Sequence, residues 1–320
     1  MLVPQMEKNW EVIEYFNKKN INVVLFVLLS QQYLYGPEMK KRGGSGLVHD
    51  VAPLSELDLS RFEDVFLKFL VGVEARKLKL AAVQIGNEFN SADFNGDLPL
   101  IQGGAVLSAK TYREYSFWSK FEGGLNKLVE AVRFTRTALN ETSQTRGTPV
   151  ILGGLARPSN EWLSQVNASL VEPGVALRTL RELGIDRYVD AYAVHIYPRL
   201  TEPVDDAGGA IASQVTSILN EARDGIDKSK PWWITEWGFP KSFARANGSN
   251  SRLGYYLSFL SILSQHWSEV VQASFIFDWN ESKVYGVWDG GSVLGTDGFF
   301  AHQEGSRFPP TIKQQSPSNP

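Results

Sequence analysis

The sequence contains no cysteine, which excludes disulfide bonds, thiolate metal sites and a cysteine nucleophile. It has only four histidines, and none of them has the spacing of a metal site, such as two His four residues apart with a Glu. An excess of positive charge is also missing, because 32 Lys and Arg stand against 35 Asp and Glu. We therefore expect no metal, no cofactor and no nucleic-acid partner.

Long apolar runs are absent as well. The longest one, at 23–29, is far too short to span a bilayer, and no apolar signal segment follows Met1, so we expect no membrane association. Whether the protein is secreted or cytoplasmic stays open, since a large core needs no disulfides in either compartment. With 43% hydrophobic and 21% charged residues, the 320-residue chain has globular composition, which argues against disorder and coiled coil.

Short apolar runs alternate with amphipathic stretches along the whole chain. The apolar runs are typical of buried parallel strands and predict six of them, at 22–29, 81–86, 149–153, 190–195, 231–235 and 272–277. Helical spacing predicts helices at 5–19, 60–77, 111–139, 174–183, 211–226 and 251–267. Ser60 is the expected N-cap of the second helix, with Glu63 completing a capping box. This alternation predicts a parallel sheet with helices outside it.

The segments between these elements are unequal in length. Those that enter strands are short, whereas those that leave strands are long and rich in Gly and polar residues, at 30–59, 89–110, 198–210, 239–250 and from 279 onward. In parallel α/β folds the ligand lies at the carboxyl ends of the strands, among these loops. A ligand-binding site is therefore expected at that end of the sheet.

Polar and aromatic side chains occur where the predicted strands end. Carboxylates, an amide, an imidazole, a phenol and indoles are all present at these positions, namely Asn87, Glu88, His195, Tyr197, Glu236, Trp237 and Trp279. Because each of them follows or ends an apolar strand, we expect their tips to converge on one cavity.

Two carboxylates at one cavity suit the cleavage of a glycosidic bond. One of them donates a proton to the leaving oxygen, and the other attacks the sugar or activates water. Apolar neighbours raise the pKa of the acid, while His195 and Tyr197 hold the other carboxylate as an anion. Asn87 can bind a sugar hydroxyl, and Trp237 and Trp279 can stack on pyranose faces. The residues thus predict a carbohydrate substrate.

The motifs Gly86-Asn87-Glu88, His195-Ile196-Tyr197 and Thr235-Glu236-Trp237-Gly238 resemble, in this order, the signature of clan A glycoside hydrolases. Families 5 and 39 of that clan share these features, and the resemblance extends from residue 22 to residue 279. It implies an α/β fold of the TIM-type (β/α)₈ barrel class and a retaining mechanism.

The resemblance also implies roles for individual residues. Glu88, at the end of strand four, corresponds to the acid/base, and Glu236, at the end of strand seven, corresponds to the nucleophile. A His-x-Tyr that ends strand six and a Trp that ends strand eight line the catalytic subsite in that clan. Asn87, His195, Tyr197 and Trp279 accordingly line the subsite, with no cofactor or metal.

One departure from the clan pattern concerns the N-terminal part. If Glu88 ends strand four, the run at 22–29 is strand three, and the first two strands have no sequence to occupy. We expect one barrel domain at 1–302 that lacks its first two β-strands, and a polar C-terminal tail at 303–320. The chain is either a fragment or a naturally short barrel. Its open sheet edges are expected to be covered by 281–320, by 30–59 or by a second copy in a homo-oligomer.

The leading prediction is a retaining β-glycosidase that cleaves a plant-type glucan, xylan or mannan by double displacement. The main alternative is a carbohydrate-binding protein that has lost catalysis, because the Arg that the clan usually carries after strand two has no counterpart here. A barrel lyase or aldolase would need a Lys at a strand end or a phosphate site, and we find neither. The pattern leaves open which sugar and linkage is cleaved, and whether action is endo or exo.

Overall fold

The computed structural model describes residues 6–44, 48–199, 207–224, 230–240, 249–277, 288–289 and 292–293. The chain divides into two compact units. The first comprises Met1–Val194 and Asn220–Lys230, and the second comprises His195–Leu219 and Pro231–Pro320. The predicted tail at 303–320 lies outside the described residues, and the prediction that 1–302 is one domain stays a prediction.

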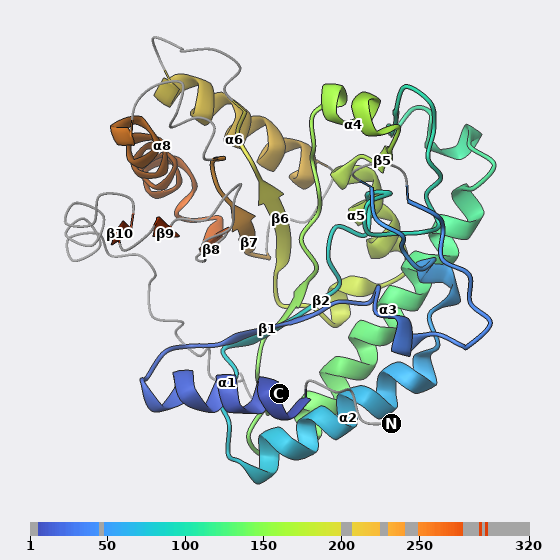
Figure 1. Ribbon diagram of the computed structural model, residues 1–320, viewed down its shortest axis with the longest axis vertical. Coiled ribbons are helices and arrows are strands. Elements are labelled where there is room, and N and C mark those ends of the chain that lie inside the picture. Colours follow the sequence, from blue (N-terminus) through green and yellow to red (C-terminus); the bar gives the residue numbers. More distant parts are fainter. Residues whose placement is uncertain are drawn as a thin grey trace, which may run out of the picture. The chain divides into compact units, whose positions relative to one another are not determined.

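The first unit is built on a parallel sheet with the strand order β1-β2-β4, of which β1 and β2 are labelled in Figure 1. Its strands are β1 (Val24–Val27), β2 (Ala82–Ile85) and β4 (Val150–Leu152). Every residue of β2 and β4 is buried, whereas those of β1, at the edge of this sheet, are half-buried. Apolar, β-branched residues on both faces suit a strand that is covered on both sides. Parallel pairing continues beyond β4 through the bridges Ile151–Ala191, directly before β6 (Tyr192–Ile196), and Leu155–Val194.

The first unit contains five α-helices among its described residues. They are α1 (Met6–Lys18), α2 (Leu59–Ala75), α3 (Trp118–Glu141), α4 (Asn160–Val166) and α5 (Pro173–Glu182). α3 packs against α2, α5, β2 and β4, as can be followed in Figure 1. Short 3₁₀ helices lie at Gln32–Leu34, Leu54–Glu56, Tyr112–Glu114 and Ile185–Arg187. The first four predicted helices are confirmed as α1, α2, α3 and α5.

The predicted cap of α2 is wrong. The N-cap is Asp58, whose carboxylate accepts hydrogen bonds from the backbone N–H groups of Ser60 at 3.1 Å and Arg61 at 3.2 Å. Ser60 instead lies inside the first turn. One oxygen of the Asp58 carboxylate thus satisfies two otherwise unpaired amides, and its negative charge is favourable at the positive end of the helix.

Two loops contain strands that the sequence patterns did not predict. β3 (Ala105–Leu107) lies in the loop after β2, and β5 (Ser169–Val171) follows α4. They pair in parallel, with Val106 opposite Leu170. Each has three residues, too few to show a period of two, which explains why neither was predicted. α4, with seven residues, is similarly short.

The second unit is built on β7 (Trp232–Trp237) and β8 (Val271–Ile276), in a sheet of order β6-β7-β8. β7 and β8 run parallel, with Trp232 opposite Val271. Its helices are α6 (Ala207–Arg223), which ends in the first unit, and α8 (Ser249–Ile262), which continues as a π-helical turn at Leu263–Trp267. Two short antiparallel strands, β9 (Trp288–Asp289) and β10 (Ser292–Val293), complete the described part.

All six predicted strands are therefore present, as β1, β2, β4, β6, β7 and β8. Within the described residues, their hydrogen bonds form separate sheets and do not close into an eight-stranded barrel. The absence of the first two barrel strands stays a prediction. None of the helices in the described part combines the length and the apolar character needed to cross a membrane.

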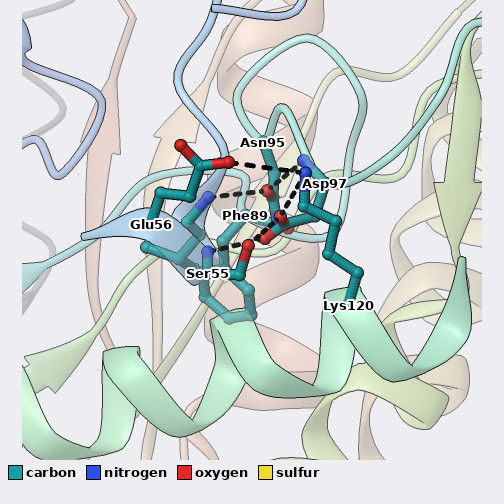
Figure 2. A network of polar contacts seen from close by, with 7 residues as sticks. Ser55, Glu56, Phe89, Asn95, Asp97 and Lys120 are labelled. Carbon is teal, nitrogen blue, oxygen red and sulfur yellow. Dashed lines mark hydrogen bonds and ion pairs between the residues drawn. The ribbon is translucent and has the colours of Figure 1, made fainter. Parts of the chain in front are cut away.

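A polar network anchors the loop between β2 and β3, as Figure 2 shows. The Asp97 carboxylate accepts hydrogen bonds from the Ser55 backbone N–H at 2.9 Å and from the Ser55 hydroxyl at 2.6 Å. Lys120 of α3 lies 3.8 Å from both Asp97 and Glu56. Burial raises the pKa of the Asp97 carboxyl, although the Ser55 hydrogen bonds and Lys120 oppose that change. The loop is thus tied to the segment before α2 and to α3.

Two adjacent glycines of α3 give a test of this anchor. A methyl group at Gly124 would overlap the Asp97 carboxylate and approach the Ser55 backbone nitrogen to 3.1 Å, whereas at Gly123 it would meet nothing within 4 Å. We expect Gly124→Ala to lower the free energy of unfolding by about 1–3 kcal/mol. Gly123→Ala should raise it by about 0.5–1 kcal/mol through helix propensity. Urea midpoints of the two variants give the comparison, and equal midpoints would contradict the anchor.

Candidate active site

Glu88 lies in a strained turn directly after β2. Its φ is +41°, in the left-handed region that residues other than glycine rarely adopt. Its backbone N–H donates to the Gly154 carbonyl at 2.8 Å, and its carbonyl accepts from Ser91 N–H at 2.8 Å. A strained backbone that persists in this way is held by its surroundings, and such positions cluster at functional sites.

Two glycines make this turn possible. Gly86 has φ +87°, and the Cβ of any other residue at 153 would lie 2.5 Å from the carbonyl carbon and oxygen of Gly86. Both contacts involve backbone atoms, which cannot move aside cheaply. Gly153 therefore lets β4 end directly against the turn that carries Asn87 and Glu88.

Asn87 has an unmet hydrogen-bonding capacity. Its side chain is half-buried, and its Oδ1 atom is buried without a hydrogen-bond partner among the residues described. A cavity of about 10 Å³ lies beside it, lined also by Leu29, Ser30 and Tyr35, which leaves space for about one water molecule. An unpaired buried acceptor costs about 1–3 kcal/mol, so a hydroxyl or water that donates to Asn87 would be bound favourably.

In the second unit, a phenol and an imidazole lie against one oxygen of Glu236. The Tyr197 hydroxyl donates to Glu236 Oε2 at 2.7 Å, and His195 Nδ1 lies 3.4 Å from the same atom. The His195 side chain is 1% exposed and that of Glu236 is 20% exposed. Hydrogen bonds to a carboxylate oxygen stabilise its ionised form and fix its orientation. The structure thus brings together three of the residues that the sequence predicted, from the adjacent strand ends of β6 and β7.

Trp237 does not present a face to solvent. It is fully buried, and its indole stacks on Phe259 with the ring centroids 4.2 Å apart and 10° between the planes. Tyr256 lies against it at 5.2 Å. The structure gives Trp237 a packing role directly after Glu236 in β7, where the aromatic core of the unit holds the strand end in place.

A buried arginine in α8 was missed from the sequence. Arg252 is 3% exposed, and its Nε donates to the Phe239 carbonyl at 3.0 Å. A second nitrogen donates to the Tyr256 hydroxyl at 3.3 Å, and the guanidinium lies over the Tyr256 ring at 5.5 Å. Arg252 thereby holds the segment that follows β7. The sequence feature that could have indicated it is that Arg252 is the one charged residue between Ser249 and Ile262.

The remaining predicted residues divide between the units. Asn87 and Glu88 belong to the first, whereas His195, Tyr197, Glu236 and Trp237 belong to the second. Trp279, predicted to stack on the substrate, lies outside the described residues. The second unit supplies the Glu236 carboxylate, which accepts a hydrogen bond from Tyr197. The first unit supplies the Glu88 carboxylate, carried on a strained backbone turn, and next to it in sequence the Asn87 amide oxygen, which has no hydrogen-bond partner among the described residues.

Comparison with known proteins identifies the fold. No protein-family model matches the chain, and no curated protein sequence does. One solved structure, from a study of two fungal β-1,4-galactanases, has a TM-score of 0.53 at 12% identity and covers 90% of this chain and 81% of that one. A broad-specificity endoglucanase, GH5-4, from an uncultured bacterium has a TM-score of 0.51 at 15% identity, with 85% and 67% covered. These neighbours have TIM-barrel folds, and this chain has an α/β fold similar to theirs, although its described strands do not close into a barrel.

Proposed function

We propose that the protein is a retaining glycoside hydrolase that cleaves β-linked bonds of a plant-type oligo- or polysaccharide such as a glucan, xylan or mannan. The observation that carries the proposal is the convergence of Tyr197 and His195 on Glu236 Oε2. A nucleophilic carboxylate must be ionised and must point one oxygen at the anomeric carbon. The Tyr197 hydrogen bond to its other oxygen, with the His195 imidazole beside that oxygen, favours both conditions. The two neighbours, a galactanase and an endoglucanase, act on carbohydrates, which supports a carbohydrate substrate.

The reaction follows two displacements. In the first, Glu236 attacks the anomeric carbon, the bond to the leaving oxygen breaks, and Glu88 donates its proton to that oxygen. In the second, Glu88 takes a proton from water, which attacks the anomeric carbon and releases Glu236. Retention requires carboxyl groups about 5–5.5 Å apart, whereas an inverting pair needs about 6.5–9.5 Å. The mechanism needs neither a metal nor a cofactor.

Asn87, His195, Tyr197 and Trp279 surround the reacting sugar in this proposal. The unpaired Oδ1 of Asn87 accepts a hydrogen bond from a sugar hydroxyl, which relieves the cost of leaving it buried without a partner. His195 and Tyr197 orient Glu236. Trp279 supplies the aromatic face for the ring.

The configuration of the first product tests the proposal. We expect cleavage of at least one member of a panel of 4-nitrophenyl β-glycosides and of β-linked glucan, xylan, mannan and galactan, measured as phenolate or as reducing ends. Proton NMR of the first minutes of aryl glycoside hydrolysis should show the β-anomer before mutarotation. An α-anomer formed first would contradict the retaining mechanism. Oligosaccharide binding without any release of reducing ends would instead establish a carbohydrate-binding protein.

A further inference from the structure

A second cluster of polar side chains lies in the first unit, formed by Arg42, Asp93 and Trp162. They come from the loop after β1, the loop after β2 and helix α4, and each is half-buried. The backbone of Arg42 pairs with Val51 through hydrogen bonds of 2.9 and 3.3 Å. Its guanidinium donates to the carbonyl of Ala92, the residue before Asp93. Arg42 is thus fixed beside Asp93 by backbone contacts at both ends.

The other side of the cluster is equally well anchored. Trp162 lies in the first turn of α4, where its backbone N–H donates to the N-cap hydroxyl of Ser159 at 3.2 Å. Its side chain donates a hydrogen bond to the Asp93 carboxylate. The loop that carries Asp93 is held to β5, because the Ala92 N–H donates to the Ser169 carbonyl at 2.9 Å. The three side chains therefore form a built site rather than a chance approach of mobile groups.

Part of the hydrogen-bonding capacity of this cluster is unused. Asp93 Oδ1 and Arg42 Nε are both buried without a hydrogen-bond partner in the described part of the chain, and the two side chains act on each other electrostatically. Burial raises the pKa of the Asp93 carboxyl, the charge of Glu88 adds to that effect, and His49, Arg42 and Trp162 oppose it. Buried polar atoms normally find partners, so an acceptor and a donor left unpaired side by side point to a ligand.

The charges of the cluster indicate which kind of ligand it can bind. The carboxylates of Asp93 and Glu88 repel an anion, and the guanidinium of Arg42 repels a cation. A neutral polyhydroxyl compound fits, because its hydroxyls can donate to Asp93 and accept from Arg42. Trp162 adds an aromatic side chain, which packs against the C–H face of a sugar ring. A sugar unit therefore satisfies all three residues.

We propose that Arg42, Asp93 and Trp162 bind the sugar unit on the leaving-group side of the scissile bond. This inference rests on the proposed function, in which Glu88 protonates the leaving oxygen. Asp93 follows Glu88 by five residues in the same loop, and the two carboxylates act on each other electrostatically. A sugar held beside Glu88 therefore lies next to the leaving oxygen. The substrate then carries at least one further sugar unit there, rather than a small non-sugar group.

Two substrates with the same cleaved sugar test the subsite. One is an oligosaccharide, whose leaving group is a sugar, and the other is the matching 4-nitrophenyl glycoside, whose leaving group is not. For Asp93→Ala we expect kcat/KM on the oligosaccharide to fall about 10–100-fold, and the ratio of oligosaccharide to aryl glycoside kcat/KM to fall at least tenfold. Trp162→Phe, which keeps a ring but loses the indole N–H, should lower the ratio in the same direction. This second variant keeps the test valid if Asp93→Ala folds poorly.

The control is Asp64→Ala, an exposed aspartate of α2 that pairs with Lys68. It should change neither rate. An equal fall on both substrates for Asp93→Ala would overturn the subsite and assign Asp93 to catalysis or folding, and no fall on either would also overturn it. If the wild-type protein cleaves neither substrate, the proposed function fails by itself. The subsite is then decided by calorimetric binding of the oligosaccharide, where Asp93→Ala must weaken Kd at least tenfold.

Discussion

Glu236→Gln should lower kcat by at least about four orders of magnitude on every substrate that the wild-type protein cleaves. Glutamine has the shape of glutamate and can still accept the hydrogen bond from the Tyr197 hydroxyl, so the packing of β7 should be kept. Its neutral amide cannot form the covalent bond to the anomeric carbon. The variant therefore separates loss of the nucleophile from loss of structure. Initial rates with a 4-nitrophenyl glycoside, together with the thermal unfolding midpoint, give both quantities.

Two further variants make this result specific. Glu269→Gln changes an exposed carboxylate of the same unit and should leave kcat unchanged. Tyr197→Phe removes only the hydroxyl that donates to Glu236 at 2.7 Å, and we expect an intermediate loss of about 10–1000-fold in kcat. A Glu236→Gln protein that turns over at a near-normal rate would end the assignment of Glu236 as nucleophile. A Tyr197→Phe protein with unchanged kcat would show that this hydrogen bond does not contribute to the reaction.

Glu88→Ala should give a loss that depends on the leaving group. General acid–base catalysis contributes about 10²–10⁴-fold, and the full amount is needed when the leaving oxygen is a poor one, such as a sugar hydroxyl. A 2,4-dinitrophenolate leaves without a proton, so the first displacement on that glycoside should stay fast. The second displacement then limits turnover, because water has lost its base. Glu88 has a positive φ, and alanine, like glutamate, has a Cβ atom there. The substitution should therefore leave the backbone strain of the turn about the same.

Rescue by azide distinguishes a general acid/base role of Glu88 from a role in folding or substrate binding. It is a nucleophile that needs no general base, so it should restore turnover of the 2,4-dinitrophenyl glycoside by Glu88→Ala and yield a β-glycosyl azide. The wild-type protein and Glu122→Ala, which changes an exposed glutamate of α3, should show no acceleration by azide. Rates with and without azide and the identity of the product are the measurements. Absence of rescue, or an equal loss on all leaving groups, would contradict the assignment of Glu88 as acid/base.

The two carboxylates differ in how their positions are established. Glu236 is within a strand, and its partners His195 and Tyr197 end the neighbouring strand, so regular strand pairing is enough to bring them together. Glu88 lies past the end of its strand, in a turn that depends on Gly86 and on the missing side chain of Gly153. We expect this turn to be the part of the machinery that tolerates substitution least.

The strands and the polar residues at their ends could be predicted from the sequence because both depend on a few neighbouring residues. Each apolar run that forms β1, β2, β4, β6, β7 or β8 is visible in a few consecutive residues, and so is each polar residue that follows it. Parallel strands place their carboxyl ends at one edge, so the predicted grouping of His195, Tyr197 and Glu236 followed from their order alone. The cap at Asp58 was misassigned because Asp58 and Ser60 are both good capping residues, and only the observed helix start distinguishes them.

What the amino-acid order determined by itself is the six strands β1, β2, β4, β6, β7 and β8, most of the helices and the residues that end these strands. Tertiary structure decided which side chains pack and which stay available for a ligand. Trp237 turned inward onto Phe259, although its sequence position was equally compatible with a platform for a sugar. Arg42, Asp93 and Trp162 became neighbours across more than a hundred residues of chain. Burial and the partner of each polar atom depend on contacts between distant segments, and no local pattern encodes such contacts.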